Sequence, residues 1–389
     1  MGAGVPSLPP PSFVVDSDGL DPNLILADMI SAFETASGRT LQPAQVERLL
    51  IDLYAYRESL VRNAIQYAAQ QNLLAFATFP MLDYLGQLLG VTRLPAQPAL
   101  TNLQFTLAST LTVSYTIPAG TRAGTADGRA IFTTSADLII PAGAQSGSVA
   151  AAATVPGADA NGYLAGQINV VLDPSALIAS VSNLTVTSGG SAPETDDHLR
   201  ARIQAAPNQF SVAGPTGAYR FFALGVDPAI IDVQVISPIP GTVEVFVLTG
   251  PITNQPAPAP NNAAIASPAL LAKVQTALSA DDVRPVTDSV HAMAVTEVDY
   301  QIQATVALYT DADPTATMNA VGVAAQQFAT NLASKIQRDI VPSQIIAALS
   351  VPGVYQVSLG LPDYVQLGPG QWANCTAIAI SESVSSEHS

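Results

Sequence analysis

The sequence predicts a multidomain α+β protein with N-terminal long helices, a β-rich sandwich-like module, and one or two small α+β modules with antiparallel sheets. Three observations support this class. A strong helical period runs through residues 43–78, a two-residue period with Gly and Pro turns fills 94–190, and strands alternate with helices from there on. A chain of 389 residues is long enough for two or three domains.

The changes of pattern also predict where the segments begin and end. We expect an extended N-terminal arm, a helical bundle-forming region, a β-rich module, an α+β module and a C-terminal α+β module, in this order, at residues 1–22, 23–93, 94–190, 191–300 and 301–389. The run Pro9, Pro10 and Pro11 favours polyproline geometry in the arm. Such an arm is either disordered or laid along a neighbour.

The composition excludes several classes of function. Only 11% of residues are charged, and 30 acids against 14 bases give a net charge of −16. So few Lys and Arg side chains disfavour nucleic-acid binding and docking on an anionic membrane. At 48% apolar the chain is not disordered, and its neutral surface favours coverage by partners.

The sequence also indicates the compartment. Cys375 is the only cysteine, so no intramolecular disulfide is expected. Residues 1–11 have neither the basic nor the apolar part of a secretory signal. The most apolar long window, 73–91, is interrupted by Pro80 and Asp83, which argues against a membrane span. We therefore expect a soluble protein that is assembled in a cytoplasm.

The strongest helical signal lies between Pro43 and Thr78. Its apolar residues recur at threes and fours: Val46, Leu49, Leu50, Leu53, Tyr54, Leu60, Val61, Ile65 and Ala68. A helix of about 35 residues would be about 50 Å long, more than a small domain needs. Two readings stay open, a long core helix and a bundle shared between subunits. Under the second reading the interface candidates on this helix are Leu49, Leu53, Arg57, Leu60 and Arg62.

A short helix follows at 81–90, with Gly90 placed just past its end. Period-two alternation then predicts short strands through Leu103, Phe105 and Leu107 and through Leu111, Val113 and Tyr115. Turns are expected at 117–120 and 140–143, and a hairpin at 125–128. The spacing of these elements is typical of a sandwich or a barrel-like module.

The remaining elements alternate between helix and strand. Glu194, Asp196 and Asp197 suit the start of a helix. The pattern further predicts a helix at 215–224, a hairpin of strands 230–236 and 242–249, a loop at 251–262, a helix at 268–279, a strand pair 290–298 and 300–308, helices at 318–337 and 342–350, and strands at 354–359 and 375–380.

The sequence shows little catalytic chemistry. His198, His291 and His388 lie in no spacing that forms a metal site or a triad, and no nucleophile elbow, zinc-protease motif or phosphate loop occurs. We therefore expect no enzyme, no metal site and no cofactor. A pair of glycosidase carboxylates carries no local signature, so a carboxylate-based hydrolase stays an alternative.

A set of short motifs, in order, resembles the baseplate J-like proteins, wedge subunits of contractile phage tails and related injection machines. The resemblance covers roughly residues 70–360. In the first half its motifs are 72–78 with 82–86 and 89–93, then 117–121 with Asp127, Gly128 and Phe132, then Gly189 and Gly190 before Glu194, Asp196, Leu199 and Arg200. In the second half they are 213–215 with Ala218 and Tyr219, then 240–243, then 283–285 with Asp288, and finally 352–354. The first ~40 and last ~20 residues lie outside it.

The resemblance implies a structural subunit without an active site, located in the tail baseplate of a virion. It implies six copies, or a multiple of six, in a ring around a central hub. The expected partners are other baseplate wedge, hub and sheath-proximal proteins, and the expected role includes transmitting the change that triggers sheath contraction. Arg93, Arg200 and Arg284 are rare cations that suit carboxylate anchoring, either at an interface or in a surface ion pair within their own domain. With Asp83 they complete the interface candidates.

One alternative comes from a different class of protein, an adhesin-like β-rich module that binds a carbohydrate or a host surface. It requires exposed aromatic side chains in 94–190, where Tyr115, Phe132 and Tyr163 are scattered.

Overall fold

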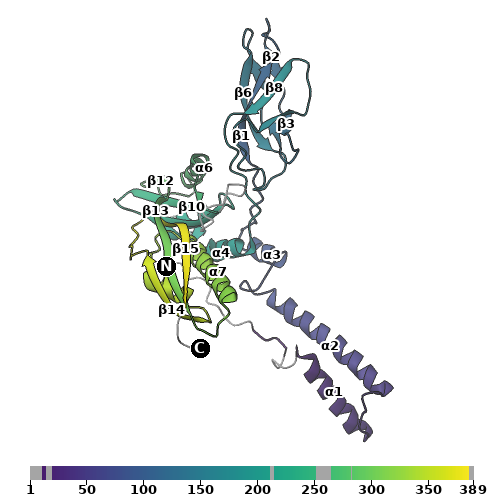
Figure 1. The fold of residues 1–389 in the computed structure, drawn as a ribbon. Coiled ribbons are helices and arrows are strands. Elements are labelled where there is room, and N and C mark those ends of the chain that lie inside the picture. The colour runs from purple at the N-terminus through teal and green to yellow at the C-terminus, as the bar shows by residue number, and fades with distance from the viewer. Residues whose placement is uncertain (1–10, 15–19, 211–213, 251–263, 282, 385–389) are drawn as a thin grey trace. The chain divides into compact units, whose positions relative to one another are not determined.

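The computed structural model describes residues 11–14, 20–210, 214–250, 264–281 and 283–384 (Figure 1). The chain divides into two compact units, residues 1–93 with 199–204, and residues 94–198 with 205–389. The expected multidomain α+β class is confirmed. The predicted loop at 251–262, most of the predicted arm and His388 lie outside the described residues.

The first unit begins with two helices, α1 (Pro22–Ser37) and α2 (Val46–Gln70). Asp21 caps α1 by accepting from the Asn23 N–H at 2.8 Å, and Gly38 ends it in the left-handed region at φ +65°. The helix predicted over 43–78 is shorter than expected. It ends at Gln70 because the Gln71 side chain accepts from the Thr78 N–H at 2.9 Å and so stabilises a turn instead.

Helix α3 (Met81–Gln87) ends as the sequence predicted. Gly90 has φ +72°, and the Val91 N–H donates to the Gly86 carbonyl at 3.0 Å, which is a Schellman closure. The second half of α4 (Asp196–Ala205) also belongs to this unit. A Cβ on Gly86 would lie 3.1 Å from an Ile203 methyl carbon, so glycine permits this close packing.

The β-rich module is one curled antiparallel sheet rather than two stacked sheets. Its strand order is β7-β3-β4-β6-β1-β8, and β7 also contacts β8, so the sheet nearly closes into a barrel. The strands are β1 (Leu100–Leu107), β3 (Arg122–Thr125), β4 (Ile131–Thr134), β6 (Ser146–Ala153), β7 (Ile168–Val171) and β8 (Ile178–Asn183). The predicted hairpin at 125–128 joins β3 to β4.

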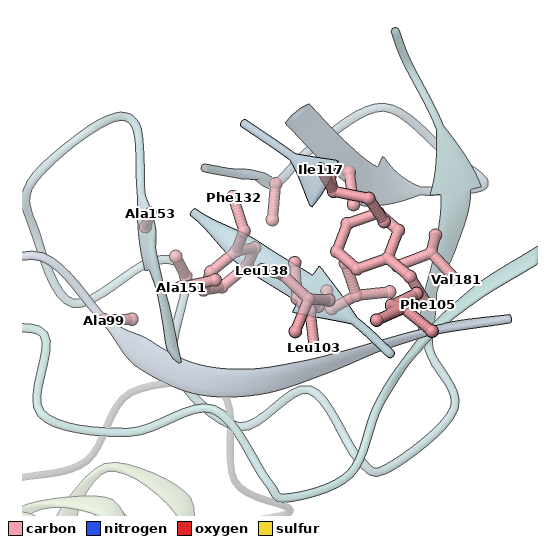
Figure 2. Close-up of a cluster of buried hydrophobic side chains, with 14 of the residues drawn as sticks. Ala99, Leu103, Phe105, Ile117, Phe132, Leu138, Ala151, Ala153 and Val181 are labelled. Atoms are coloured by element: carbon pink, nitrogen blue, oxygen red, sulfur yellow. The ribbon is translucent and has the colours of Figure 1, made fainter. Parts of the chain in front are cut away.

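Two further strands of this module, β2 (Tyr115–Ile117) and β5 (Leu138–Ile140), pair with each other, and each leads into one of the two predicted Pro and Gly turns. The strand expected through Leu111 and Val113 does not form. Figure 2 shows the core, in which Phe105 and Phe132 are fully buried.

The next sheet contains the predicted hairpin of β9 (Ile230–Ile236) and β10 (Thr242–Thr249), confirmed residue for residue. Strand β11 (Ala264–Ile265) and strand β12 (Ser289–Ala294) also pair with β10, along the edge opposite β9. The 3₁₀ helix η2 (Ala206–Phe210) precedes this region, whose helices are α5 (Thr216–Leu224) and α6 (Pro268–Leu278). Tyr219 and Val274 on these helices are buried in the core of this sheet.

The last sheet has the order β14-β13-β15 and consists of β13 (Thr296–Leu308), β14 (Val354–Leu361) and β15 (Gln371–Val384). Helices α7 (Pro314–Ala333) and α8 (Pro342–Leu349) share its core. Asp313 caps α7 by accepting from the Ala316 N–H at 3.1 Å, so the helix begins at Pro314, earlier than the predicted 318. Cys375 is buried in β15, as expected for a small apolar side chain.

Two details of the predicted α+β modules are wrong. The strands expected as a pair over 290–298 and 300–308 belong to different sheets, because β12 passes into β13 through buried Val295 without a turn. The sheets are also mixed rather than antiparallel. The segment carrying α6 returns the chain so that β12 runs parallel to β10, and β15 runs parallel to β13.

Polar contacts join the two α+β sheets within the second unit. The buried Asp232 carboxylate on β9 accepts from the Ile336 N–H at 3.0 Å and from Lys335 Nζ at 3.4 Å. The Gly370 N–H donates to Gln234 Oε1 at 2.7 Å. A shared apolar cluster that contains Phe246 and Trp372 lies beside these contacts.

Across the described ranges, no helix combines the length and the apolar character that crossing a membrane requires.

Candidate interaction surface

Helix α2 exposes an unusual amount of apolar surface. Only Ala55 and Ser59 are buried along its length. Five large apolar residues follow a three-four spacing on one side, and each is between 44% and 68% exposed: Val46, Leu49, Leu53, Tyr56 and Leu60. Exposed Asn63 and Tyr67 continue the spacing. This is the a/d repeat of a coiled coil, and we name these seven residues the α2 seam.

A different face of α2 packs on α1. Ile51 and Glu58 line a shallow groove there with Met29 and Phe33 of α1. The predicted candidates Leu49, Leu53 and Leu60 therefore belong to the exposed seam and not to the core of this helical pair. Single exposed apolar residues are normal on a protein surface, whereas a continuous stripe of them marks an interaction site.

The arginines of α2 differ in their surroundings. Arg48 pairs with Asp52 at 2.9 Å, and Arg62 pairs with Glu58, both at i,i+4 spacing. Arg57 is exposed and makes no ion pair within the described residues. Of the two predicted arginine candidates on α2, Arg57 thus keeps its charge available, while Arg62 is engaged on its own helix.

Part of the predicted arm also contacts α2. The Gln66 side chain donates from Nε2 to the Pro11 carbonyl at 2.6 Å and accepts from the Phe13 N–H at 2.7 Å. These two bonds hold residues 11–14 against the helix, which is an intramolecular version of the contact expected for this arm.

Asp83 and Arg93, predicted separately as interface candidates, are partners of each other. Arg93 Nε donates to Asp83 Oδ1 at 2.9 Å, and both side chains are about one-fifth exposed. The Arg93 guanidinium also lies 5.8 Å from the centre of the Phe79 ring. The pair therefore fastens α3 to the segment that follows it.

Arg200 donates to backbone carbonyl oxygens of the first unit. Its guanidinium donates to the carbonyl oxygens of Leu74 and Ala77, each at 2.8 Å. Arg202, two residues farther along α4, donates to the Thr92 carbonyl at 3.1 Å. These bonds satisfy carbonyls in the turns on either side of α3, where the helical ladder is interrupted.

Arg284 lies in the second unit, apart from the candidates of the first unit in the division of the chain. It donates to the carbonyls of Ser279 at 3.1 Å and Asp288 at 2.9 Å. The Asp288 carboxylate accepts from the Tyr219 hydroxyl at 2.7 Å. Burial, followed by this hydrogen bond, raises the pKa of Tyr219 above its ordinary value.

The described residues give little support to the other functional classes. His198 Nδ1 lies 2.6 Å from Glu194 Oε1, but no group of three or more potential metal ligands occurs among the described residues. Within the barrel, Phe132 is fully buried, and Tyr115 and Tyr163 pack partly against the core. The barrel therefore lacks the exposed aromatic platform that the adhesin alternative requires.

Several residues of the seam and of the contact between the α+β sheets were not among the predicted candidates. Tyr56, Asn63 and Tyr67 belong to the seam, and the signal that finds them is the strict three-four alternation, a heptad, in place of general helical periodicity. Asp232 and its contacts between the two α+β sheets carry no local signal, because their partners lie about a hundred residues away.

Comparison with known proteins agrees with the architecture. Family models for the baseplate J-like N-terminal, barrel, central and C-terminal domains match residues 46–99, 102–190, 211–294 and 300–381. Baseplate protein J of Escherichia phage P2 is 35% identical over 187 residues, which are 48% of this chain and 58% of that protein. A chain in the six-fold symmetrised cryo-EM structure of the anti-feeding prophage baseplate aligns with a TM-score of 0.41 and 15% identity, over 92% of this chain and 90% of that one.

The domain models follow one another along the chain in the order of the α2–α3 segment, the barrel and the two α+β sheets. Matched in this way from residue 46 to residue 381, the chain belongs to the baseplate J-like protein family.

Proposed function

We propose that this protein is a structural subunit of the baseplate of a contractile tail, without a catalytic role. In this proposal six copies, or a multiple of six, form the wedge ring around the central hub, in a virion tail assembled in the host cytoplasm. Wedge, hub and sheath-proximal proteins are the proposed partners. Membership of the baseplate J-like family and similarity to baseplate protein J of phage P2 support the proposal. The proposal keeps the five segments predicted from the sequence, at residues 1–22, 23–93, 94–190, 191–300 and 301–389.

The exposed α2 seam is the observation that supports an assembly role most strongly. Covering one large apolar side chain contributes about 1.5–3 kcal/mol, so a seam with six of them offers a substantial driving force for helix pairing. A protein that stayed monomeric would leave this surface in water. We therefore propose that a helix of another baseplate protein packs along the seam.

The residues beside the seam favour a defined pairing. Asn63 takes a d position of the heptad that begins at Val46, and a polar residue in a seam fixes register at some cost in stability. Arg57 takes an e position of the same repeat. A carboxylate on the partner helix would pair with its exposed guanidinium and select both partner and orientation.

The proposed role in contraction follows from assembly at such contacts. A ring whose interfaces have two packings of similar free energy changes from one to the other when a distant event favours the second. In this proposal, receptor engagement elsewhere in the tail supplies that bias, and the wedge ring passes it toward the sheath.

To test the assembly role of the seam, Leu53 and Leu60 are both replaced with Asp in the tail particle that contains this protein. We expect the variant chain to keep its melting temperature, because both side chains are exposed, but to be missing from tails, which then lack complete baseplates. Val323→Asp is the matched control, since Val323 is a similarly exposed apolar residue on α7. The proposal is wrong if tails without this chain still carry complete baseplates, or if the double variant assembles normally.

A further inference from the structure

Strand β15 leaves a long edge open in the last sheet. It is 14 residues long, and within the described part of the chain it pairs with β13 alone. The stretch 377–383 spans about 23 Å and contains no Pro, Lys or Arg, the residues that commonly protect an edge. Unprotected edges pair readily with another strand.

The exposed face of the sheet beside residues 377–383 carries no charged side chain. The side chains that line it across the three strands are small or neutral: Gln303 and Thr305 on β13, Ser358 and Gly360 on β14, and Ala379 and Ser381 on β15. In a chain of net charge −16 a neutral face is a place where two copies meet without repulsion.

The opposite face of the edge is only partly covered. Ile378 and Ile380 pack against the core that α7 and α8 share with the sheet, yet both side chains remain half-buried. A strand added beside β15 would extend the sheet and cover the rest of these two residues.

We propose that the occupant of this edge is β15 of a second copy, paired antiparallel about a two-fold axis beside Ile380. In this register Ile380 faces its own copy, Ala379 faces Ser381, and Glu382 faces Ile378. Glu382, the only charged residue of the stretch 377–383, therefore does not lie opposite Glu382 of the second copy, where two like charges would destabilise the pairing. The pairing is isologous, so each copy supplies the same surface.

The inference rests on the proposed function for its use, as a contact that pairs two copies at each repeat of a six-fold ring, because an isologous contact cannot link successive copies of a ring of six. Its test needs only the purified full-length chain, so the dimer at the β15 edge and the proposed baseplate function can fail separately. Cys375 is buried, which leaves an introduced cysteine as the reactive thiol among the described residues.

The first experiment compares Ile380→Cys with Glu382→Cys under catalysed oxidation. Residues directly opposite across a pair of strands have Cβ atoms about 4.5–5.5 Å apart, whereas the two Glu382 positions would be four residues apart, about 13 Å. We expect Ile380→Cys to form disulfide-linked dimers on the order of tenfold faster. Equal rates, or faster cross-linking of Glu382→Cys, would overturn the register.

The second experiment measures mass by light scattering against protein concentration. The double change Ala379→Lys and Ser381→Lys places lysines directly opposite each other, so we expect it to weaken the dimer on the order of tenfold or more. Gln356→Lys with Ser358→Lys adds the same charge to β14, the opposite edge, and should dimerise like the wild type.

Two results contradict the inference. One is a wild-type chain that stays monomeric at its highest soluble concentration. The other is a dimer that survives the β15 lysines but is lost with Leu53→Asp and Leu60→Asp, which would place the contact between copies at the α2 seam and leave the proposed function intact.

Discussion

The guanidinium of Arg93 donates to the carboxylate of Asp83 at 2.9 Å, so two residues expected at an interface neutralise each other within the first unit. Each side chain is about one-fifth exposed. At that depth the surroundings are less polar than water, and the pair stabilises the turn after α3 more than a fully exposed pair would.

A double-mutant cycle on Arg93→Ala and Asp83→Ala measures this pair. We expect a coupling free energy of about 1 kcal/mol from urea unfolding of the full chain. Arg129 and Asp127 are the control, because they lie 3.6 Å apart at a far more exposed site and should show almost no coupling. A loss of baseplate assembly without loss of stability in Arg93→Ala would instead assign Arg93 to a partner.

Replacing Arg200 tests its bonds to the Leu74 and Ala77 carbonyls. We expect Arg200→Ala to lower the free energy of unfolding by about 2 kcal/mol, because two charge-assisted hydrogen bonds are lost. Arg200→Lys should recover less than half, since one ammonium cannot reproduce the planar fork. Amide hydrogen exchange in 71–78 should speed up in both variants and stay unchanged in Arg129→Ala.

Asp232→Ala tests the connection between the two α+β sheets. The carboxylate accepts from Arg220 at 2.6 Å as well as from Lys335 and the Ile336 N–H. We expect a loss of about 2–3 kcal/mol, since the buried Ile336 N–H and two partly exposed cations lose their shared acceptor. Asp173→Ala, which breaks an exposed pair with Arg122, should cost less than about 1 kcal/mol. A smaller effect at Asp232 than at Asp173 would contradict this assignment.

Tyr219 should make the protein sensitive to alkali. Burial, and then the hydrogen bond to Asp288, raises the pKa of Tyr219 in the folded state above its value of about 10 in the unfolded chain. The folded protein thus holds this proton more tightly. Its contribution to stability is complete below about pH 10 and is lost as the pH rises toward the folded-state pKa.

Tyr219→Phe should therefore lose less stability above pH 10 than the wild type does. Near neutral pH its free energy of unfolding should be about 1 kcal/mol lower than that of the wild type, because the hydrogen bond to Asp288 is lost. Tyr54→Phe, at an exposed site on α2, should retain the alkaline loss of the wild type. Parallel pH profiles for wild type and Tyr219→Phe would rule out Tyr219 as the source.

Local signals in the sequence predicted the fold well where turns are explicit. The β9–β10 hairpin was predicted to the residue, because Pro238, Pro240 and Gly241 separate two apolar runs. The pairing of β12 with β13 was predicted wrongly because no turn residues separate the two runs. Two apolar runs adjoin there, but the buried Val295 between them forms no turn, so the strands enter separate sheets.

The candidate surface was predictable in part. Leu49, Leu53 and Leu60 were identified from helical periodicity, and the structure adds that their face of α2 is exposed. The partner of Arg200 was not predictable, since its carbonyl acceptors lie more than a hundred residues away and carbonyls carry no sequence signature. The arginines that make such contacts could thus be singled out from the sequence, whereas the carbonyl groups that accept their hydrogen bonds could be identified only from the structure.

A side-chain-resolution cryo-EM map of the tail particle that contains this protein tests whether it builds the baseplate through the α2 seam. We expect this chain in the baseplate in six copies or a multiple of six, with a helix of another protein packed along Val46, Leu53 and Leu60. A baseplate without this chain, or an assembled chain whose seam remains exposed to solvent, would contradict this expectation.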